Sequence, residues 1–93
     1  MNLEIKNRHG ERLDCTFRAG DPKSKDLVLI GHGVTGNKDR PLIVALGEAL
    51  PAIGLNTLRF SFSGNGASGG SFVDSTITKE VEDLGALLDA LAG

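Results

Sequence analysis

A serine and a histidine in separate glycine-rich stretches are the residues of this chain that could take part in covalent catalysis. Ser68 lies in GASGG, which fits G-x-S-x-G, the pattern in which a sharp strand-to-helix turn exposes a nucleophilic serine. Such a serine needs a base within hydrogen-bond reach, and in folds with this turn the base follows the serine in the chain. Both histidines, His9 and His32, precede Ser68, and the next helical pattern begins only near Ile77. We therefore interpret Ser68 as a structural serine in a flexible glycine loop.

The stretch GHGVTG offers a different chemistry, because it fits the G-x-G-x-x-G fingerprint for binding a dinucleotide pyrophosphate. That fingerprint opens directly into a helix, whereas here NKD and Pro41 delay the helix. The acid that would bind a ribose hydroxyl is also absent from the end of the next strand, RFSFS. The second match, GNGASG, begins at Gly64 and has no helix directly after it. A dinucleotide-binding unit is therefore an alternative and not our main interpretation.

Composition narrows the possible partners of the chain. The 93 residues are 40% hydrophobic and 24% charged with a net charge of −2, and their basic residues form no cluster, so we expect no nucleic-acid partner. No apolar run approaches the length of a membrane span, and the N-terminus lacks an apolar signal region. We expect a cytoplasmic protein without membrane attachment. Cys15 is the one cysteine, so no internal disulfide can form and we expect a buried thiol. We expect no metal or cofactor.

Four short segments have the pattern of strands. LEIKN and ERLDCTFRA alternate apolar and polar residues around the turn signal RHG, which predicts a hairpin with Leu13, Cys15 and Phe17 on one face. LVLIG at 27–31 is a continuous apolar run, as in a strand covered on both faces. LNTLRFSF at 55–62 is the fourth strand.

Two segments have helical periodicity. The first follows NKD, with Asp39 as the expected N-cap, Pro41 in the first turn, Pro51 as a kink or early stop, and Gly54 as the end. The second is ITKEVEDLGALLDALAG, and its apolar stripe predicts an amphipathic helix through Ile77, Val81, Leu84, Leu88 and Leu91. The element order is a hairpin followed by βαβα, which predicts an α/β fold with helices on a parallel or mixed sheet.

Three segments in this order resemble the N-terminal part of an α/β-hydrolase of the esterase or acyl-peptidase type. They are LVLIGHGVTGNKDRPLIVALGEAL, LNTLRFSFSGNGASGGSF and TKEVEDLGALLDAL. In that family the third strand ends in a His-Gly turn, the fourth ends in an R-F-D-F-x-G-x-G-x-S-type loop, and a helix then leads toward the G-x-S-x-G strand. The resemblance implies one partial domain over 1–93, an incomplete sheet of strand order 1-2-4-3 and two main helices.

The resemblance also implies roles for the turn after the third strand. His32 and Gly33 would shape the turn, and the backbone N–H of Val34 would point into the oxyanion hole. Such a donor stabilises the tetrahedral intermediate, and losing one costs about 3 kcal/mol of transition-state stabilisation. Gly36 and Asn37 would continue the loop, with His32 in a structural role and not as the catalytic base.

One residue departs from the family pattern in the loop after the fourth strand. The family usually has an aspartate where this chain has Ser61, and a carboxylate accepts backbone N–H groups more strongly than a hydroxyl. We therefore expect a looser loop from 63 to 75. Gly64, Gly66 and Ser68 fall within that loop, which agrees with a structural Ser68.

The resemblance places the nucleophile, acid and base of a serine hydrolase beyond Gly93. We therefore expect a piece of a hydrolase for ester, thioester or peptide substrates that is inactive alone. A binding or scaffold module is the alternative. The strand at 27–31 would then be an open apolar edge, and such edges recruit another strand. We expect a homo-oligomer through this edge, or a partner that carries the complementary C-terminal half.

Overall fold

The computed structural model describes residues 2–33 and 36–92. Its elements in chain order are β1 (Asn2–Lys6), β2 (Arg12–Arg18), β3 (Leu27–Ile30), α1 (Pro41–Ala49), the short 3-10 helix η1 (Leu50–Ile53), β4 (Asn56–Phe60), the 3-10 turn η2 (Phe72–Asp74) and α2 (Ile77–Ala92).

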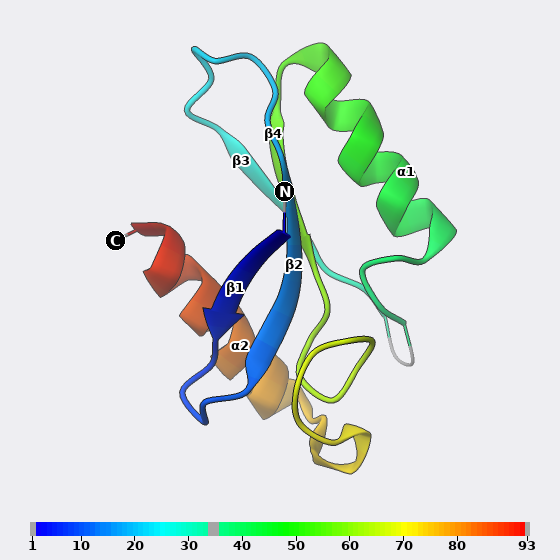
Figure 1. Ribbon diagram of the computed structural model, residues 1–93, viewed down its shortest axis with the longest axis vertical. Helices are drawn as coiled ribbons and strands as arrows, with labels where there is room; N and C mark the ends of the chain where they lie inside the picture. The colour runs from blue at the N-terminus through cyan, green and yellow to red at the C-terminus, as the bar shows by residue number, and fades with distance from the viewer. Residues whose placement is uncertain (1, 34–35, 93) are drawn as a thin grey trace.

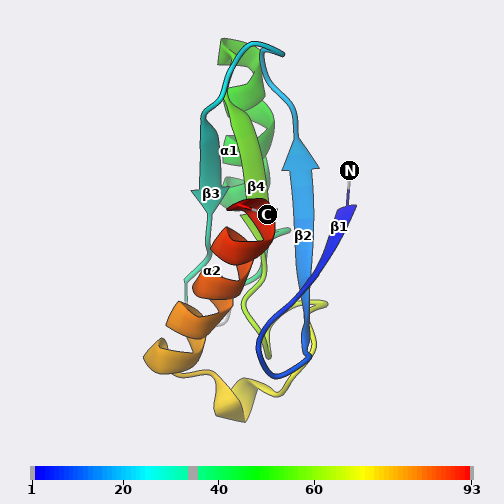
Figure 2. The same cartoon turned by 90° about the vertical axis from the view of Figure 1, so that its left-hand side faces the viewer.

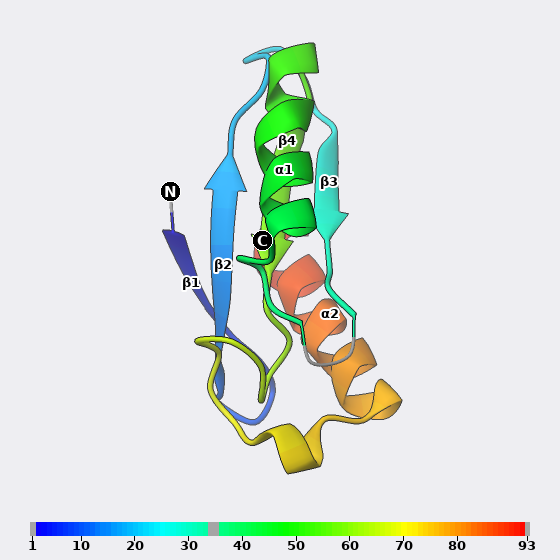
Figure 3. The same cartoon turned by 90° about the vertical axis from the view of Figure 1, so that its right-hand side faces the viewer.

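The strands form one mixed sheet with the order β1-β2-β4-β3, as expected. β2 pairs antiparallel with β1 and β4, and β3 runs parallel to β4 with Leu29 opposite Leu58. The helices lie on opposite faces of this sheet, with α1 on one side and α2 on the other (Figure 1). Figure 2 looks onto the α2 side and Figure 3 onto the α1 side, and in both views β3 forms one edge of the sheet.

The apolar core lies between the sheet and α2. Its buried members come from β2, β4 and α2: Leu13, Cys15, Leu58, Phe60 and Leu87. Phe17 is partly buried and packs against this cluster, so the predicted alternation along β2 is confirmed. Side chains from alternate strand positions reach one face, which is why a period of two identified this surface from sequence.

The start of α1 differs from the expectation. The N-cap is Arg40 and not Asp39, and no side chain caps this helix. The reason is Pro41, which disfavours helical angles in the residue before it, and Arg40 is accordingly extended at φ −62° and ψ 143°. The Asp39 carboxylate instead accepts a hydrogen bond from the Lys38 ammonium at 3.1 Å.

The end of this helical segment follows the expectation for Pro51. The α-helix stops at Ala49, and the chain continues as the 3-10 helix η1, in which the Pro51 carbonyl accepts the Gly54 N–H at 3.0 Å. Gly54 ends the segment in the left-handed region at φ 96°. No helix within residues 2–33 and 36–92 has the length and apolar character needed to cross a membrane.

The apolar stripe of α2 does not form its buried face. The fully buried side chains of α2 are Asp83 and Leu87, whereas the stripe from Ile77 to Leu91 is exposed. Asp83 is tolerated in the interior because its carboxylate accepts hydrogen bonds from Asn7 Nδ2 at 2.9 Å and from the Ser63 N–H at 2.7 Å. Three segments therefore meet at Asp83, and helical periodicity alone could not locate this contact.

Ionic contacts fix the flank of α2 that faces the β1–β2 hairpin. Lys79 Nζ lies 2.9 Å from Glu11 Oε1, and Arg8 contacts Glu82 at 3.0 Å. Hydrogen bonds from Asn7 and then Lys79 lower the pKa of Glu11, and the bond to Glu11 raises the pKa of Lys79. These contacts orient α2 about its own axis.

Candidate functional site

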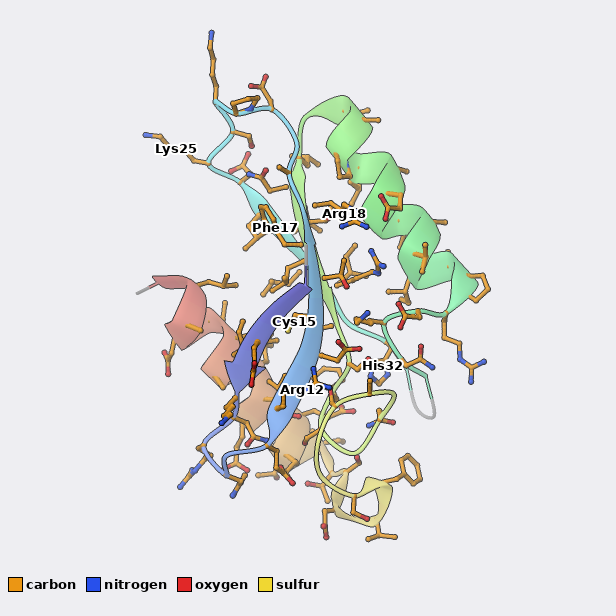
Figure 4. The ribbon with its side chains drawn as sticks, viewed as in Figure 1. Arg12, Cys15, Phe17, Arg18, Lys25 and His32 are labelled. Atoms are coloured by element: carbon orange, nitrogen blue, oxygen red, sulfur yellow. The ribbon has the colours of Figure 1, made fainter. Side chains whose placement is uncertain are left out.

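The imidazole of His32 joins the turn after β3 to the loop after β4. Its Nε2 accepts the Phe62 N–H at 3.0 Å, so the proton lies on Nδ1, which is 2.7 Å from the Gly33 carbonyl oxygen and donates to it. The ring also meets Phe62 edge-on, with 5.2 Å between centroids. Figure 4 shows His32 at the end of the sheet where these two segments meet. Both ring nitrogens therefore have backbone partners, and the imidazole connects these two segments.

The turn beyond His32 is closed by a short backbone bond. The Gly36 N–H donates to the Gly33 carbonyl at 3.0 Å. A side chain at Gly36 would meet that same carbonyl oxygen at 3.0 Å and His32 Cβ at 3.1 Å, so glycine allows the close approach. Val34, the expected oxyanion donor, lies outside the described residues, and its role stays a prediction.

The segment after this turn is anchored to β4 and its following residue. Ser61 is fully buried, and its hydroxyl accepts the Lys38 N–H at 2.9 Å. Arg59 Nε donates to the Lys38 carbonyl at 3.2 Å, and Asn37 Oδ1 accepts the Asp39 N–H at 2.8 Å. The Ser61 hydroxyl thus accepts a backbone N–H, although Ser61 lacks the carboxylate of the family pattern.

Two cations beneath α1 were not recognised in the sequence. The Lys38 and Arg59 side chains are only 8% and 9% exposed. Lys38 Nζ lies 3.4 Å from Asp14 Oδ2, and Arg59 Nη1 lies 3.5 Å from Glu48 Oε1. Buried charges persist when they are paired: the first pair joins the segment before α1 to β2, and the second joins β4 to α1. A cation within the apolar stretch LRF was the available signal, but its partners are distant in sequence.

The glycines after β4 bring the two loops into contact. Gly66 has φ +54°, and a Cβ there would lie 2.8 Å from Asn37 Cβ and 2.9 Å from Ser61 Oγ. Gly64 has φ +79°, and a Cβ there would meet the Ser71 carbonyl oxygen at 2.5 Å. Both positions combine a left-handed backbone with a close approach, which favours glycine.

The Ser68 hydroxyl is committed to the backbone. It donates to the Ser61 carbonyl at 2.6 Å and accepts the Asp14 N–H at 2.7 Å. Neither contact is to a histidine: His32 bonds to Phe62 and Gly33, and His9 lies 3.5 Å from Glu82. The loop that we expected to be looser is therefore tied to β2 through Ser68.

The fold does not favour the dinucleotide interpretation of GHGVTG. α1 begins at Pro41, whereas the last glycine of the motif is Gly36. The backbone between them is bonded to Ser61 and Arg59 instead of opening a helix. The pyrophosphate geometry of that fingerprint needs the glycine turn at the helix N-terminus.

The mixed sheet of order β1-β2-β4-β3 with one helix on each face has the architecture of an incomplete α/β-hydrolase fold. Solved structures agree with this class. Over 97% of its length, the chain matches Est1E from Butyrivibrio proteoclasticus, a structure with bound ferulic acid, at 33% identity and a TM-score of 0.89. It also matches an esterase from Pyrococcus furiosus at 29% identity with a TM-score of 0.79. An α/β serine hydrolase homologue from Coxiella burnetii matches at 26% identity with a TM-score of 0.80, and each match covers 98% of this chain.

The chain matches the N-terminal part of α/β serine hydrolases and esterases, so the resemblance inferred from the sequence is confirmed. It spans 36% of the Est1E chain, 35% of the Pyrococcus esterase and 44% of the Coxiella homologue. No protein-family model matches the sequence, and neither does any curated protein.

Proposed function

We propose that this chain forms the part of a serine hydrolase that shapes the oxyanion turn, for substrates that are carboxylic esters or related acyl compounds. The observation that supports this most directly is the bonding at the described ends of the turn after β3: His32 bonds to Phe62 and Gly33, and the Gly36 N–H donates to the Gly33 carbonyl. An oxyanion donor is effective only when its position is fixed before the reaction. The nucleophile, acid and base would come from further polypeptide, so the chain alone has no turnover.

The placement of this turn supports the proposal. β3 and β4 are parallel, so the loops that follow them leave the sheet at the same end. In open α/β sheets, ligands bind outside the carboxyl ends of the strands. The contact between His32 and Phe62 ties together two loops at this end.

The surface at this end suits an apolar acyl or aryl group. Phe72 and Val73 in η2 are 50% and 85% exposed, and η2 lies at the same end of the molecule as the turn after β3 (Figure 1). Est1E is described with ferulic acid, an aromatic carboxylic acid, which supports aryl esters as the first substrates to try.

A chimera tests the proposed function. This chain replaces the matched part of Est1E, and hydrolysis of a chromogenic aryl ester is measured in the folded chimera. We expect turnover, with kcat lowered at least tenfold by Gly36→Val and changed less than twofold by Ala52→Val. Gly36→Val crowds the turn, whereas Ala52 is exposed in η1 on the far side of the fold.

A folded chimera without turnover would overturn the proposal and favour the binding or scaffold alternative.

We also propose a cytoplasmic location, which the free, buried thiol of Cys15 supports because it fits a reducing compartment.

A further inference from the structure

One flank of the molecule exposes a row of large apolar side chains. On α2, the side chains of Ile77, Val81, Leu84, Leu88 and Leu91 are 36–81% exposed. Their spacing of four and three residues places them in one stripe along the helix, with the 3.5-residue period of a helix-packing seam. An exposed row of this regularity marks a contact surface and not scattered surface hydrophobicity.

The contacts of α2 determine the direction in which this stripe faces. Leu87 points into the core, and Lys79 and Glu82 reach the β1–β2 hairpin. At 3.6 residues per turn, the stripe lies about a quarter turn from Leu87 and on the flank opposite the hairpin. In the order β1-β2-β4-β3, the flank opposite the hairpin is the β3 side, and Figure 2 shows α2 between these two edges.

The edge of the sheet on that same side is apolar and open. Among the described residues, β3 pairs only with β4, and its sequence is LVLI. The opposite edge strand, β1, instead carries the exposed charged residues Glu4 and Lys6, which discourage edge pairing. The two edges of the sheet are therefore chemically different.

The helix on the other face of the sheet repeats the arrangement. In α1, Glu48 reaches Arg18 on β2 at 3.1 Å, which fixes the flank of α1 on the hairpin side. Leu42 and Leu46 lie on the opposite flank and are 69% and 42% exposed. Figure 3 shows β3 on the side of α1 away from β2. We call the β3 edge, Leu42, Leu46 and the α2 stripe together the open apolar face.

We propose that the open apolar face docks the polypeptide that completes the hydrolase domain, by adding a strand to β3 and packing helices against α1 and the α2 stripe. This inference rests on the proposed function. The argument for this occupant is length: Est1E matches 97% of this chain with a TM-score of 0.89, yet the match uses 36% of Est1E. The rest of such a chain needs an apolar surface to pack against. The flank of α2 at the hairpin is already occupied by ion pairs, so the open apolar face is the surface that remains.

In the test, the tagged 93-residue chain is co-expressed with the part of Est1E outside the match, and the tagged chain is then purified by affinity. We expect a one-to-one complex on affinity purification, with slower hydrogen exchange at Leu27–Ile30 than in the isolated chain. Leu88→Glu, on the stripe, should weaken the complex at least tenfold. Thr78→Glu adds the same charge to an exposed position of α2 off the stripe and should change affinity less than twofold.

The chimera with Est1E keeps the test decisive when the separate parts do not stay folded. In the chimera, Leu88→Glu should lower the urea midpoint clearly more than Thr78→Glu. Equal midpoints, or fast exchange at Leu27–Ile30 in a folded chimera, would overturn the docking proposal. A complex or chimera with a protected β3 and no ester turnover would leave docking standing and overturn the proposed function alone.

Discussion

The Nε2 atom of His32 accepts the backbone N–H of Phe62 at 3.0 Å, so one side chain joins the two loops that leave the parallel strands β3 and β4. The same ring donates to the Gly33 carbonyl through Nδ1. This pair of bonds needs the neutral imidazole, and it ties His32 and Gly33 to the loop after β4. The start of the turn is thus positioned by tertiary contacts and not by its own sequence alone.

Replacing His32 by alanine should loosen this connection. The Phe62 N–H would lose its acceptor in a partly buried place, at a cost of about 1–2 kcal/mol in the free energy of unfolding. Urea unfolding followed by circular dichroism measures this change in the free energy of unfolding. His9→Ala is the control, because His9 makes only a 3.5 Å contact with Glu82 and should change stability by less than about 0.5 kcal/mol. Equal effects of the two substitutions would contradict the bridging role.

Replacing Ser68 by alanine should affect stability and not catalysis. The substitution removes the partner of both the Asp14 N–H and the Ser61 carbonyl, at a cost of about 1–3 kcal/mol. The exposed Ser71→Ala is the matched control. In the Est1E chimera, ester turnover measured below the unfolding transition should persist in Ser68→Ala. Loss of turnover in a fully folded variant would show that Ser68 is the nucleophile after all.

Two glycines should respond to alanine with opposite signs. Gly66→Ala forces a side chain into a left-handed backbone and against Asn37 Cβ at 2.8 Å, so it should destabilise by at least about 1 kcal/mol. Gly85→Ala places the methyl in open space within α2 and should stabilise by about 0.5–1 kcal/mol. Thermal unfolding of both variants checks this, and a shift of the same sign in both would refute the interpretation.

The Cys15 thiol should stay protonated well above the pH at which an exposed thiol ionises. Burial, and next the Asp14 charge, raise the pKa of Cys15 from 9.0 to about 11. The folded state thus favours the neutral thiol, so this contribution to stability is complete below about pH 9 and is lost as the pH rises toward 11. Iodoacetamide at pH 8 should label the native protein far more slowly than the urea-unfolded protein. Cys15→Ala should flatten the alkaline decline in stability, and an unchanged decline would count against the buried thiol as its cause.

The isolated chain should self-associate when no partner covers the open apolar face. The unpaired edge of β3 and the exposed apolar stripe of α2 offer the same contacts to a second copy. Light scattering across a dilution series should show mass rising with concentration for the wild type and Thr78→Glu. Leu88→Glu should remain monomeric at concentrations at least tenfold higher. A wild-type chain that stays monomeric at millimolar concentration would contradict this expectation.

The sequence alone determined the local features of this protein. The alternation of apolar and polar residues predicted the buried face of β2 with Leu13 and Cys15. Pro51 predicted the early end of α1. The His-Gly turn and the glycine loop indicated the superfamily. Each of these depends on residues close together in the chain, where backbone geometry follows directly from residue type.

Only the tertiary structure decided how distant residues pair. Periodicity identified an apolar stripe on α2, but Asp83 and Leu87 are the residues that it buries. The hydroxyl of Ser68, the ammonium of Lys38 and the guanidinium of Arg59 likewise find partners on other elements. A residue's type shows which contacts it can make, whereas burial and hydrogen bonding depend on which segments the fold brings against it.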